Sequence, residues 1–247
     1  MPTQLSSQEK KSNPKTFEQD IEKMFDSIAP AYDKLNRILS LGLDRYWRAR
    51  LRRLVSQDKD VRLLDLATGT GDQLISIVKS CKNITSALGI DLSQAMINKG
   101  RDKIKHQSYE NKVTLRQGNA LNTGLENSSV DCITLSFGLR NVSCLKTCLA
   151  ESFRLLAPSG RLIVLEFSTP THPVFQWGHR QYLKFIVPKI GALISKKGYA
   201  YNYLGDSIGA FNTPKHIVNL FKEVGFSKVR HIPLTLGVVS LYVGDKE

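Results

Sequence analysis

The sequence has no uninterrupted apolar run approaching the ~18 residues that a membrane-spanning helix needs. The nearest such stretch, residues 182–194, is broken by Lys184, Pro188 and Lys189. Residues 1–15 are polar and contain no apolar segment of the kind found in secretory signals. We therefore expect a cytoplasmic protein, with a disordered tail over residues 1–15 and a single folded domain over residues 16–247.

Cysteine is also scarce, with four residues and no CxxC pair. Cys144 and Cys148 stand four positions apart in a helical pattern, and one such pair is a weak metal site. The sequence therefore predicts buried free thiols in a reducing compartment, and no metal. Acidic residues are in the minority, because 22 Asp and Glu face 35 Lys and Arg, a formal charge of +13. This excess indicates an anionic partner but does not choose among nucleic acid, a membrane and a phosphorylated ligand.

Strands alternating with helices dominate the middle of the chain. Apolar residues at helical spacing predict N-terminal helices over residues 17–55. Strands follow over 61–67, 85–90, 113–116, 132–136 and 162–166, and again over 228–232 and 238–243. This order predicts an α/β fold with a seven-stranded, mostly parallel Rossmann-like sheet that ends in an antiparallel hairpin. Residues 170–212 interrupt the alternation, and we interpret them as a cap insertion.

The densest motif follows the first strand, where Asp65 precedes a turn containing Gly69, Thr70 and Gly71. A glycine-rich turn between a strand and a helix brings backbone N–H groups against a ligand. The dinucleotide fingerprint is absent because Leu74 stands where its third glycine belongs, and no Gly-Lys-Ser/Thr follows for a phosphate loop. The alternative is a tight turn without a ligand.

Two further signals stand at the ends of the second and third strands. Asp91 is placed to accept hydrogen bonds from both hydroxyls of a ribose, although an aspartate here also serves as a helix N-cap. Asn119 and the backbone N–H of Ala120 are placed to bind the edge of an adenine, or else form a simple turn. Together the three sites resemble class I S-adenosylmethionine-dependent methyltransferases, which orient the sulfonium methyl toward an acceptor.

The fourth strand leads into Arg140 and Asn141, which offer a cation and an amide where an acceptor ring would lie. The alternative for Arg140 is a surface salt bridge. Methyltransferases that act on bases usually carry an Asn/Asp-Pro-Pro-Tyr/Phe turn or a Pro-Cys nucleophile here, and the sequence has neither. A nucleic-acid methyltransferase is therefore a less favoured alternative, and we expect no nucleic-acid partner. A non-catalytic S-adenosylmethionine-binding subunit is also less favoured, because both Asp91 and Arg140 are present.

Four stretches resemble the ubiquinone/menaquinone biosynthesis C-methyltransferases of the UbiE/MenG type. They are residues 25–47, 136–142, 154–168 and 201–211. The chain departs from the family pattern at Leu35, at Asp44 and within 157–160, where methionine, histidine and Lys-Pro-Gly-Gly are usual. The resemblance implies that Thr70, Asp91, Asn119, Ala120 and Ser136 contact S-adenosylmethionine.

The resemblance further implies methylation of a ring carbon of a polyprenylated quinol. We expect demethylmenaquinol as the acceptor, with a methoxybenzoquinol of ubiquinone biosynthesis as the alternative. An arginine stays protonated, so Arg140 suits stabilisation of a phenolate better than proton abstraction. Asn141 and Tyr32 are placed to position the ring or a water, although Tyr32 is equally well read as a core aromatic.

Residues 172–204 carry basic side chains among aromatic and aliphatic ones and contain no acid. Such a segment suits reversible contact with the anionic inner face of the cell membrane. The alternative is a substrate lid whose lysines are merely solvated. A homodimer is also possible on this sequence.

Overall fold

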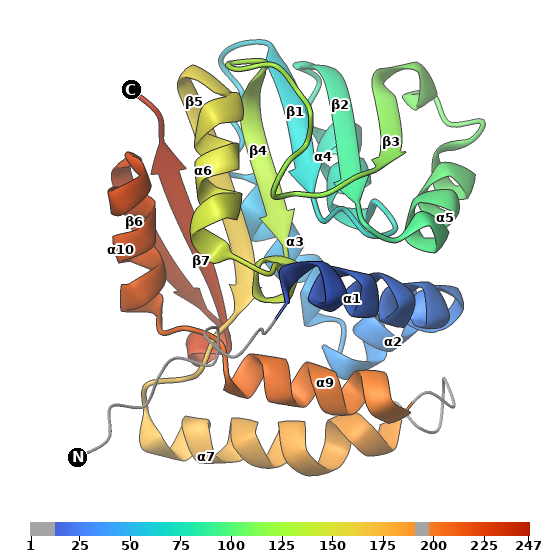
Figure 1. Cartoon of the computed structure of the whole chain (residues 1–247), viewed down its shortest axis with the longest axis vertical. Helices are drawn as coiled ribbons and strands as arrows, with labels where there is room; N and C mark the ends of the chain where they lie inside the picture. The colour runs from blue at the N-terminus through green and yellow to red at the C-terminus, as the bar shows by residue number, and fades with distance from the viewer. Residues whose placement is uncertain (1–12, 191–197) are drawn as a thin grey trace.

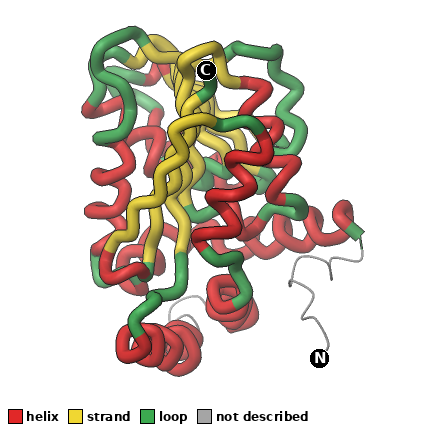
Figure 2. Tube along the Cα trace, turned by 90° about the vertical axis from the view of Figure 1, so that its left-hand side faces the viewer, coloured by secondary structure: helices red, strands yellow, loops and turns green. Residues whose placement is uncertain are grey.

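The computed structural model describes residues 13–190 and 198–247. Helices cover both faces of a central sheet, and further helices lie beyond the carboxyl ends of its strands (Figures 1 and 2). The strands are β1 Val61–Leu66, β2 Ile84–Asp91, β3 Val113–Gln117, β4 Val130–Ser136, β5 Leu156–Phe167, β6 Ser227–Leu234 and β7 Val239–Asp245. Each of the predicted strands is present, and β5 begins earlier than expected.

The sheet order is β3-β2-β1-β4-β5-β7-β6, and β7 runs antiparallel to both of its neighbours, β5 and β6. The predicted parallel sheet with a terminal hairpin is therefore confirmed. The middle strands are apolar and buried because both of their faces are covered. Helices α3 (Leu43–Arg52), α4 (Asp72–Ser80) and α5 (Gln94–Ile104) share one core, whereas α6 (Leu145–Leu155) and α10 (Pro214–Val224) pack in the other.

Local signals fix the helix ends. Thr213 caps α10 through its side chain, Pro214 is the first helical residue, and Gly225 ends the helix with a φ of 115°. The N-terminal helix α1 (Pro14–Ile28) is capped by Asn13, so the helix begins two residues before the predicted domain start at residue 16. The remaining residues of the predicted tail, 1–12, lie outside the described part.

Two helices, α2 (Tyr32–Leu39) and α3, follow α1 after a 3-10 turn at Ala29–Ala31. Leu41 and Gly42, with φ values of 52° and 79°, separate α2 from α3. Figure 1 shows α1 lying across the carboxyl ends of the strands, between the sheet and α9. These ends carry the predicted site residues, so α1 is placed to cover them.

The predicted cap insertion contains α7 (Pro173–Gln181), a π-helical turn at Tyr182–Ile186 and α9 (Gly198–Gly209). Apolar side chains of this segment pack against α1 and α2 in a third core, which includes Ile21, Leu35 and Val187. The predicted segment 172–204 falls partly outside the described residues, at 191–197. No helix within residues 13–190 and 198–247 is long and apolar enough to span a membrane.

None of the four cysteines, all of which lie in the described part of the chain, forms a disulfide. Three are buried as predicted, whereas Cys144 is exposed because it precedes α6 as its N-cap residue. In the described part of the chain no cluster of His, Cys, Asp or Glu has the arrangement of a metal site.

Candidate active site

The glycine-rich turn after β1 is held by a buried carboxylate. Asp65 accepts hydrogen bonds from the hydroxyls of Thr68 at 2.6 Å and Thr134 at 2.5 Å. Burial raises the pKa of Asp65 to about 6. Gly69 has a φ of 57°, and its N–H donates to Asp91 Oδ2 at 2.7 Å. Asp65 therefore shapes the turn from beneath, while Gly69 brings the turn against the end of β2.

Asp91 closes this turn from β2. Its other oxygen, Oδ1, accepts the N–H of Ser93 at 2.9 Å, and burial raises its pKa to about 6. Ser93, and not Asp91, caps α5 through a hydroxyl that accepts the N–H of Met96 at 3.1 Å. Ser93 therefore takes the N-cap position that the sequence offered as the alternative role of Asp91.

A cavity of about 70 Å³ lies at these strand ends. Its lining includes five of the predicted cofactor residues, Gly69, Asp91, Asn119, Ala120 and Ser136. Ser136 Oγ is buried and has no hydrogen-bond partner in residues 13–190 or 198–247. Unpaired buried polar atoms are rare in folded proteins, so this hydroxyl fits a ligand that brings its own polar groups. The donors and acceptors of this cavity therefore suit an adenosyl group.

Three carboxylates of α1 accept hydrogen bonds from residues at the strand ends, and two of them, Glu18 and Glu22, line the cavity. Glu18 accepts hydrogen bonds from Asn119 Nδ2 at 2.9 Å and from Ser143 Oγ at 2.7 Å. Glu22 accepts from Gln117 Nε2 at 3.0 Å, and Asp26 accepts from Ser93 Oγ at 2.6 Å. Residues four apart share one face of a helix, so α1 lies over the strand ends with a row of acceptors.

The closed position of α1 limits the cavity. Pockets that hold small molecules measure about 300–1,000 Å³, well above the 70 Å³ here. Glu18 also takes the Asn119 amide that is predicted to bind adenine. A cofactor bound here as predicted would therefore displace Glu18 from Asn119.

Three predicted cofactor residues lie outside this cavity's lining: Asp65, which holds the turn from below, and the turn residues Thr70 and Gly71. The hydroxyl of Thr70 donates to Asp33 Oδ1 at 2.6 Å and accepts from Lys103 Nζ at 2.7 Å. It therefore joins α2 to α5. Gly71 has a φ of 78° and serves as the N-cap residue of α4. The structure thus gives all three residues a part in the turn, and their contact with the cofactor stays a prediction.

A second, larger cavity of about 420 Å³ lies between the N-terminal helices and the cap. Most of its lining is apolar, and Phe137, Arg140 and Phe167 form its end at the sheet. Phe25, Tyr32 and Phe137 line both cavities. A wall of three aromatic side chains therefore separates the cofactor cavity from the larger one, which is where a methyl group would pass.

The three predicted catalytic residues meet at this wall. Arg140 lines the larger cavity, Asn141 the smaller one, and Tyr32 both. Burial raises the pKa of Tyr32 above its ordinary value, so its hydroxyl stays protonated. Tyr32 also packs against the third core, so its catalytic role stays a prediction.

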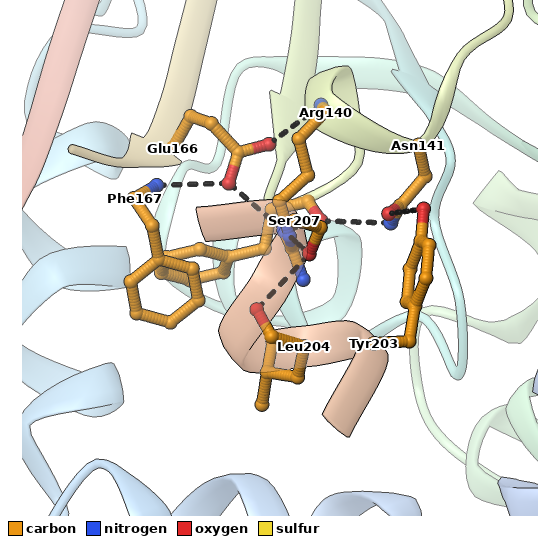
Figure 3. Close-up of polar contacts among 8 residues, drawn as sticks. Arg140, Asn141, Glu166, Phe167, Tyr203, Leu204 and Ser207 are labelled. Carbon is orange, nitrogen blue, oxygen red and sulfur yellow. Dashed lines mark hydrogen bonds and ion pairs between the residues drawn. The ribbon is translucent and has the colours of Figure 1, made fainter. Parts of the chain in front are cut away.

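Arg140 forms a buried ion pair that sequence reasoning missed (Figure 3). Its Nη1 lies 2.8 Å from Glu166 Oε1, and its backbone N–H donates to Oε2 at 3.0 Å. The side chains are 6% and 0% exposed, which excludes the surface salt bridge. The Arg140 Nε also donates to Ser207 Oγ at 3.3 Å, from α9.

Asn141 is likewise tied to the cap. Tyr203 of α9 donates its hydroxyl proton to Asn141 Oδ1 at 3.1 Å (Figure 3). Tyr203 and Ser207 fall in the stretch 201–211 that resembles the family, and Glu166 falls in the stretch 154–168. This resemblance was the available signal for all three. The pairings themselves span 26 to 67 residues, beyond the reach of local pattern.

Comparisons with known proteins define the class. The fold matches a crystal structure of an S-adenosylmethionine-dependent methyltransferase from Thermotoga maritima, a possible histamine N-methyltransferase, with a TM-score of 0.64 and 15% identity. The match covers 91% of this chain and 99% of that one. A second methyltransferase, from Aquifex aeolicus, gives 0.59 at 13% identity and covers 81% and 89%. The protein thus has the fold of this class.

Sequence relatives narrow the class to a family. The model of the ubiE/COQ5 methyltransferase family matches residues 13–246. The ubiquinone/menaquinone biosynthesis C-methyltransferase UbiE of Citrifermentans bemidjiense is 41% identical over 92% of this chain and 96% of its own. The demethylmenaquinone methyltransferase of Bacteroides fragilis is 36% identical over 95% and 96%. The chain belongs to the ubiE/COQ5 family and is an S-adenosylmethionine-dependent C-methyltransferase.

Proposed function

We propose that the enzyme methylates a ring carbon of a polyprenylated quinol, with demethylmenaquinol as the preferred acceptor. The observation that carries this proposal is the 420 Å³ apolar cavity that meets the cofactor cavity at Tyr32 and Phe137. A phenolic ring held at this wall would face the sulfonium methyl, and its prenyl tail would extend between α2 and the cap. The names of the relatives, which refer to quinone biosynthesis and to demethylmenaquinone, support the same substrate class.

The chemistry needs an electron-rich ring carbon. Loss of the proton from a quinol hydroxyl to water places negative charge on the adjacent carbon. That carbon bonds to the methyl group while the carbon–sulfur bond breaks and its electron pair stays on sulfur. The ring then loses its own proton to water. Tyr32, Asn141 and Arg140 are assigned to hold the ring and the charged oxygen at the wall, where preorganised donors stabilise developing charge.

The naphthoquinol preference rests on an aromatic cluster at the inner end of the cavity. Phe137 and Phe167 have ring centroids 4.7 Å apart, and Trp47 lies 6.0 Å from Phe137 and 6.1 Å from Phe167. Flat apolar surfaces of this extent suit a fused two-ring system. A methoxybenzoquinol would bring polar ether oxygens against the same rings, which supports the menaquinone precursor over the ubiquinone one.

Contact with a membrane fits the same cavity. Leu41, Val174, Phe175 and Leu236 line it and are also exposed, at 79%, 66%, 43% and 65%. We call these four residues the apolar rim. Trp177 of α7 is likewise 66% exposed. An apolar rim around a substrate entrance suits insertion into the edge of a bilayer, so we place the enzyme in the cytoplasm at the inner face of the cell membrane. No part of the proposal involves nucleic acid, and a homodimer stays a prediction.

A competition assay tests this function. Purified enzyme receives S-adenosylmethionine with equal amounts of a short-chain demethylmenaquinol and the matching methoxybenzoquinol, both kept reduced. We expect methylation at the ring carbon of the naphthoquinol, with a higher kcat/KM than for the benzoquinol. A higher value for the benzoquinol would reverse the substrate choice, and methylation of neither ring would contradict the proposed function.

A further inference from the structure

Arg48 is a cation in the larger cavity that sequence reasoning passed over. It lies on α3 and lines this cavity, and it is absent from the lining of the cofactor cavity. Its guanidinium carbon lies 5.7 Å from the ring centroid of Phe137. Arg140 takes the corresponding place over Phe167, at 5.3 Å. Two guanidinium groups therefore flank the Phe137–Phe167 pair at the end of the cavity.

The two arginines differ in their partners. Arg140 is matched by the carboxylate of Glu166 at 2.8 Å. The Nε of Arg48 is buried and has no hydrogen-bond partner in the described residues. Leaving a buried donor unpaired is unfavourable, and more so for a charged group. A ligand oxygen at this end of the cavity would therefore give Arg48 the hydrogen-bond acceptor that its Nε lacks.

The acidic groups around Arg48 are engaged elsewhere. Asp44, one turn earlier on α3, binds Arg37 and Ser40. Asp65 at the end of β1 accepts from two threonine hydroxyls, and Glu166 at the end of β5 holds Arg140. Tyr32, from α2, keeps its proton because burial raises its pKa. No carboxylate within the described part of the chain forms an ion pair with Arg48.

We propose that Arg48 binds the ionised oxygen of the methyl acceptor and so favours its deprotonation. The proposal rests on the proposed function, since it assigns the charge-bearing contact within that site. The Arg140–Glu166 pair has no net charge, whereas Arg48 forms no ion pair within the described residues and offers its positive charge to a phenolate. The buried carboxylate of Asp65 interacts with this charge at longer range. A cation without an ion-pair partner in a largely apolar cavity stabilises an anion more strongly than it would in water. Arg140 then contributes a hydrogen-bond donor to the charged oxygen, and Arg48 supplies the net positive charge.

Three variants test the role of Arg48. Arg48→Leu removes the charge, Arg48→Lys keeps it, and Arg53→Leu removes an exposed arginine from the end of the same helix. We expect Arg48→Leu to lower kcat by about 100-fold, as for loss of one preorganised donor. Its S-adenosylmethionine affinity stays within about twofold of wild type, because Arg48 does not line that cavity. Arg48→Lys recovers most of the rate, and Arg53→Leu matches wild type.

The pH profile gives a readout that a purely structural role would not move. Loss of the cation raises the pKa of the bound acceptor hydroxyl, so the rising limb of kcat/KM shifts to higher pH in Arg48→Leu and returns in Arg48→Lys. An unmoved limb would overturn the proposal. An equal loss of S-adenosylmethionine affinity would also overturn it, because Arg48 would then hold the carboxylate of the cofactor. If Arg48→Leu fails to fold, Arg48→Gln takes its place.

A probe separates this proposal from the function on which it rests. The colour of 4-nitrophenol reports its ionisation, and its titration in the cavity requires no turnover of a quinol. We expect bound 4-nitrophenol to ionise at lower pH in wild type than in Arg48→Leu. Equal titration in the two proteins would contradict the assignment of Arg48 even if quinol methylation is confirmed. A lowered pKa without quinol methylation would keep Arg48 as an anion site and reject the quinol.

Discussion

Arg140 and Glu166 form an ion pair of 2.8 Å that is almost wholly removed from solvent. Glu166 also accepts the N–H groups of Arg140 and Phe167. The carboxylate therefore fixes the backbone after β4 as well as the guanidinium. The pair thereby fixes Arg140 in the lining of the larger cavity, while Glu166 lies buried behind it.

Replacing one member of this pair should destabilise the fold. Glu166→Gln leaves Arg140 charged and buried without its partner, so we expect a loss of about 3 kcal/mol in the free energy of unfolding. Glu223 is the matched control, because it pairs with Lys146 at the surface. Glu223→Gln should change the free energy by less than about 1 kcal/mol. Urea denaturation measures both free energies of unfolding. Equal losses in the two variants would show that burial does not make the Arg140–Glu166 pair more important for stability than a surface pair.

Catalysis and stability can be separated at the same pair. Arg140→Leu should lower turnover by about two to three orders of magnitude, as for a lost oxyanion donor, and should also destabilise the protein. The double variant Arg140→Leu/Glu166→Leu removes the stranded carboxylate, so it should regain stability while turnover stays low. Denaturation curves and initial rates report the two quantities. Recovery of turnover in the double variant would reduce Arg140 to a structural residue.

Cofactor binding should depend on the ionisation of Asp91. Its pKa of about 6 means that the carboxylate gains a proton as the pH falls through this value. A neutral carboxyl accepts the two ribose hydroxyls less strongly, so S-adenosylmethionine affinity should decline below pH 6. Folding raises the pKa of Asp91 from 3.8 to about 6, so between these pH values the folded state binds more protons than the unfolded state. The contribution of Asp91 to the free energy of unfolding therefore falls as the pH rises through this range.

Calorimetry between pH 5 and pH 8 checks this dependence. Asp91→Asn should remove it, and Asp91→Ala should weaken binding by about 100-fold, the effect of losing charge-assisted hydrogen bonds. A wild-type affinity that stays constant over this range, or an unchanged affinity in Asp91→Ala, would remove Asp91 from the ribose site.

Movement of α1 should govern entry of the cofactor. Glu18→Ala breaks the bonds to Asn119 and Ser143, so we expect both association and dissociation of S-adenosylmethionine to accelerate, by about tenfold for hydrogen bonds worth ~1 kcal/mol. Asp20, an exposed acid on the same helix, is the control. Stopped-flow fluorescence gives the rates. Identical rates in Glu18→Ala and Asp20→Ala would mean that α1 does not limit entry.

The sequence predicted the strands, the terminal hairpin and the ligand edge of the sheet, because each follows from local periodicity and turn residues such as Gly69. It also placed Asp91, Asn119 and Ser136 in one cavity. It did not predict the hydrogen bond between Glu18 and Asn119, which are 101 residues apart, or the hydrogen bond from Thr70 to Asp33. These contacts depend on how α1 and α2 pack against the strand ends, and packing of this kind leaves no local pattern.

Membrane binding should depend on both charge and the apolar rim. Co-sedimentation with anionic vesicles should be strong at low salt and weaker at high salt, since ions screen surface charges beyond about 10 Å at 0.1 M. Leu41→Ser/Leu236→Ser should reduce binding at both salt concentrations, because it removes exposed apolar area from the rim. Equal, negligible sedimentation with anionic and neutral vesicles would contradict membrane binding, and a substrate lid would remain as the interpretation of residues 172–204.

The quinone content of a cell that lacks this enzyme tests the central claim most directly. Mass spectrometry of extracted lipids should show a menaquinone lighter by one methyl group in the deletion strain, and the methylated form after return of the wild-type gene. Return of the Asp91→Ala variant should leave the lighter form. Unchanged menaquinone in the deletion strain, in a host with no second methyltransferase of this family, would contradict the assignment of quinol C-methylation.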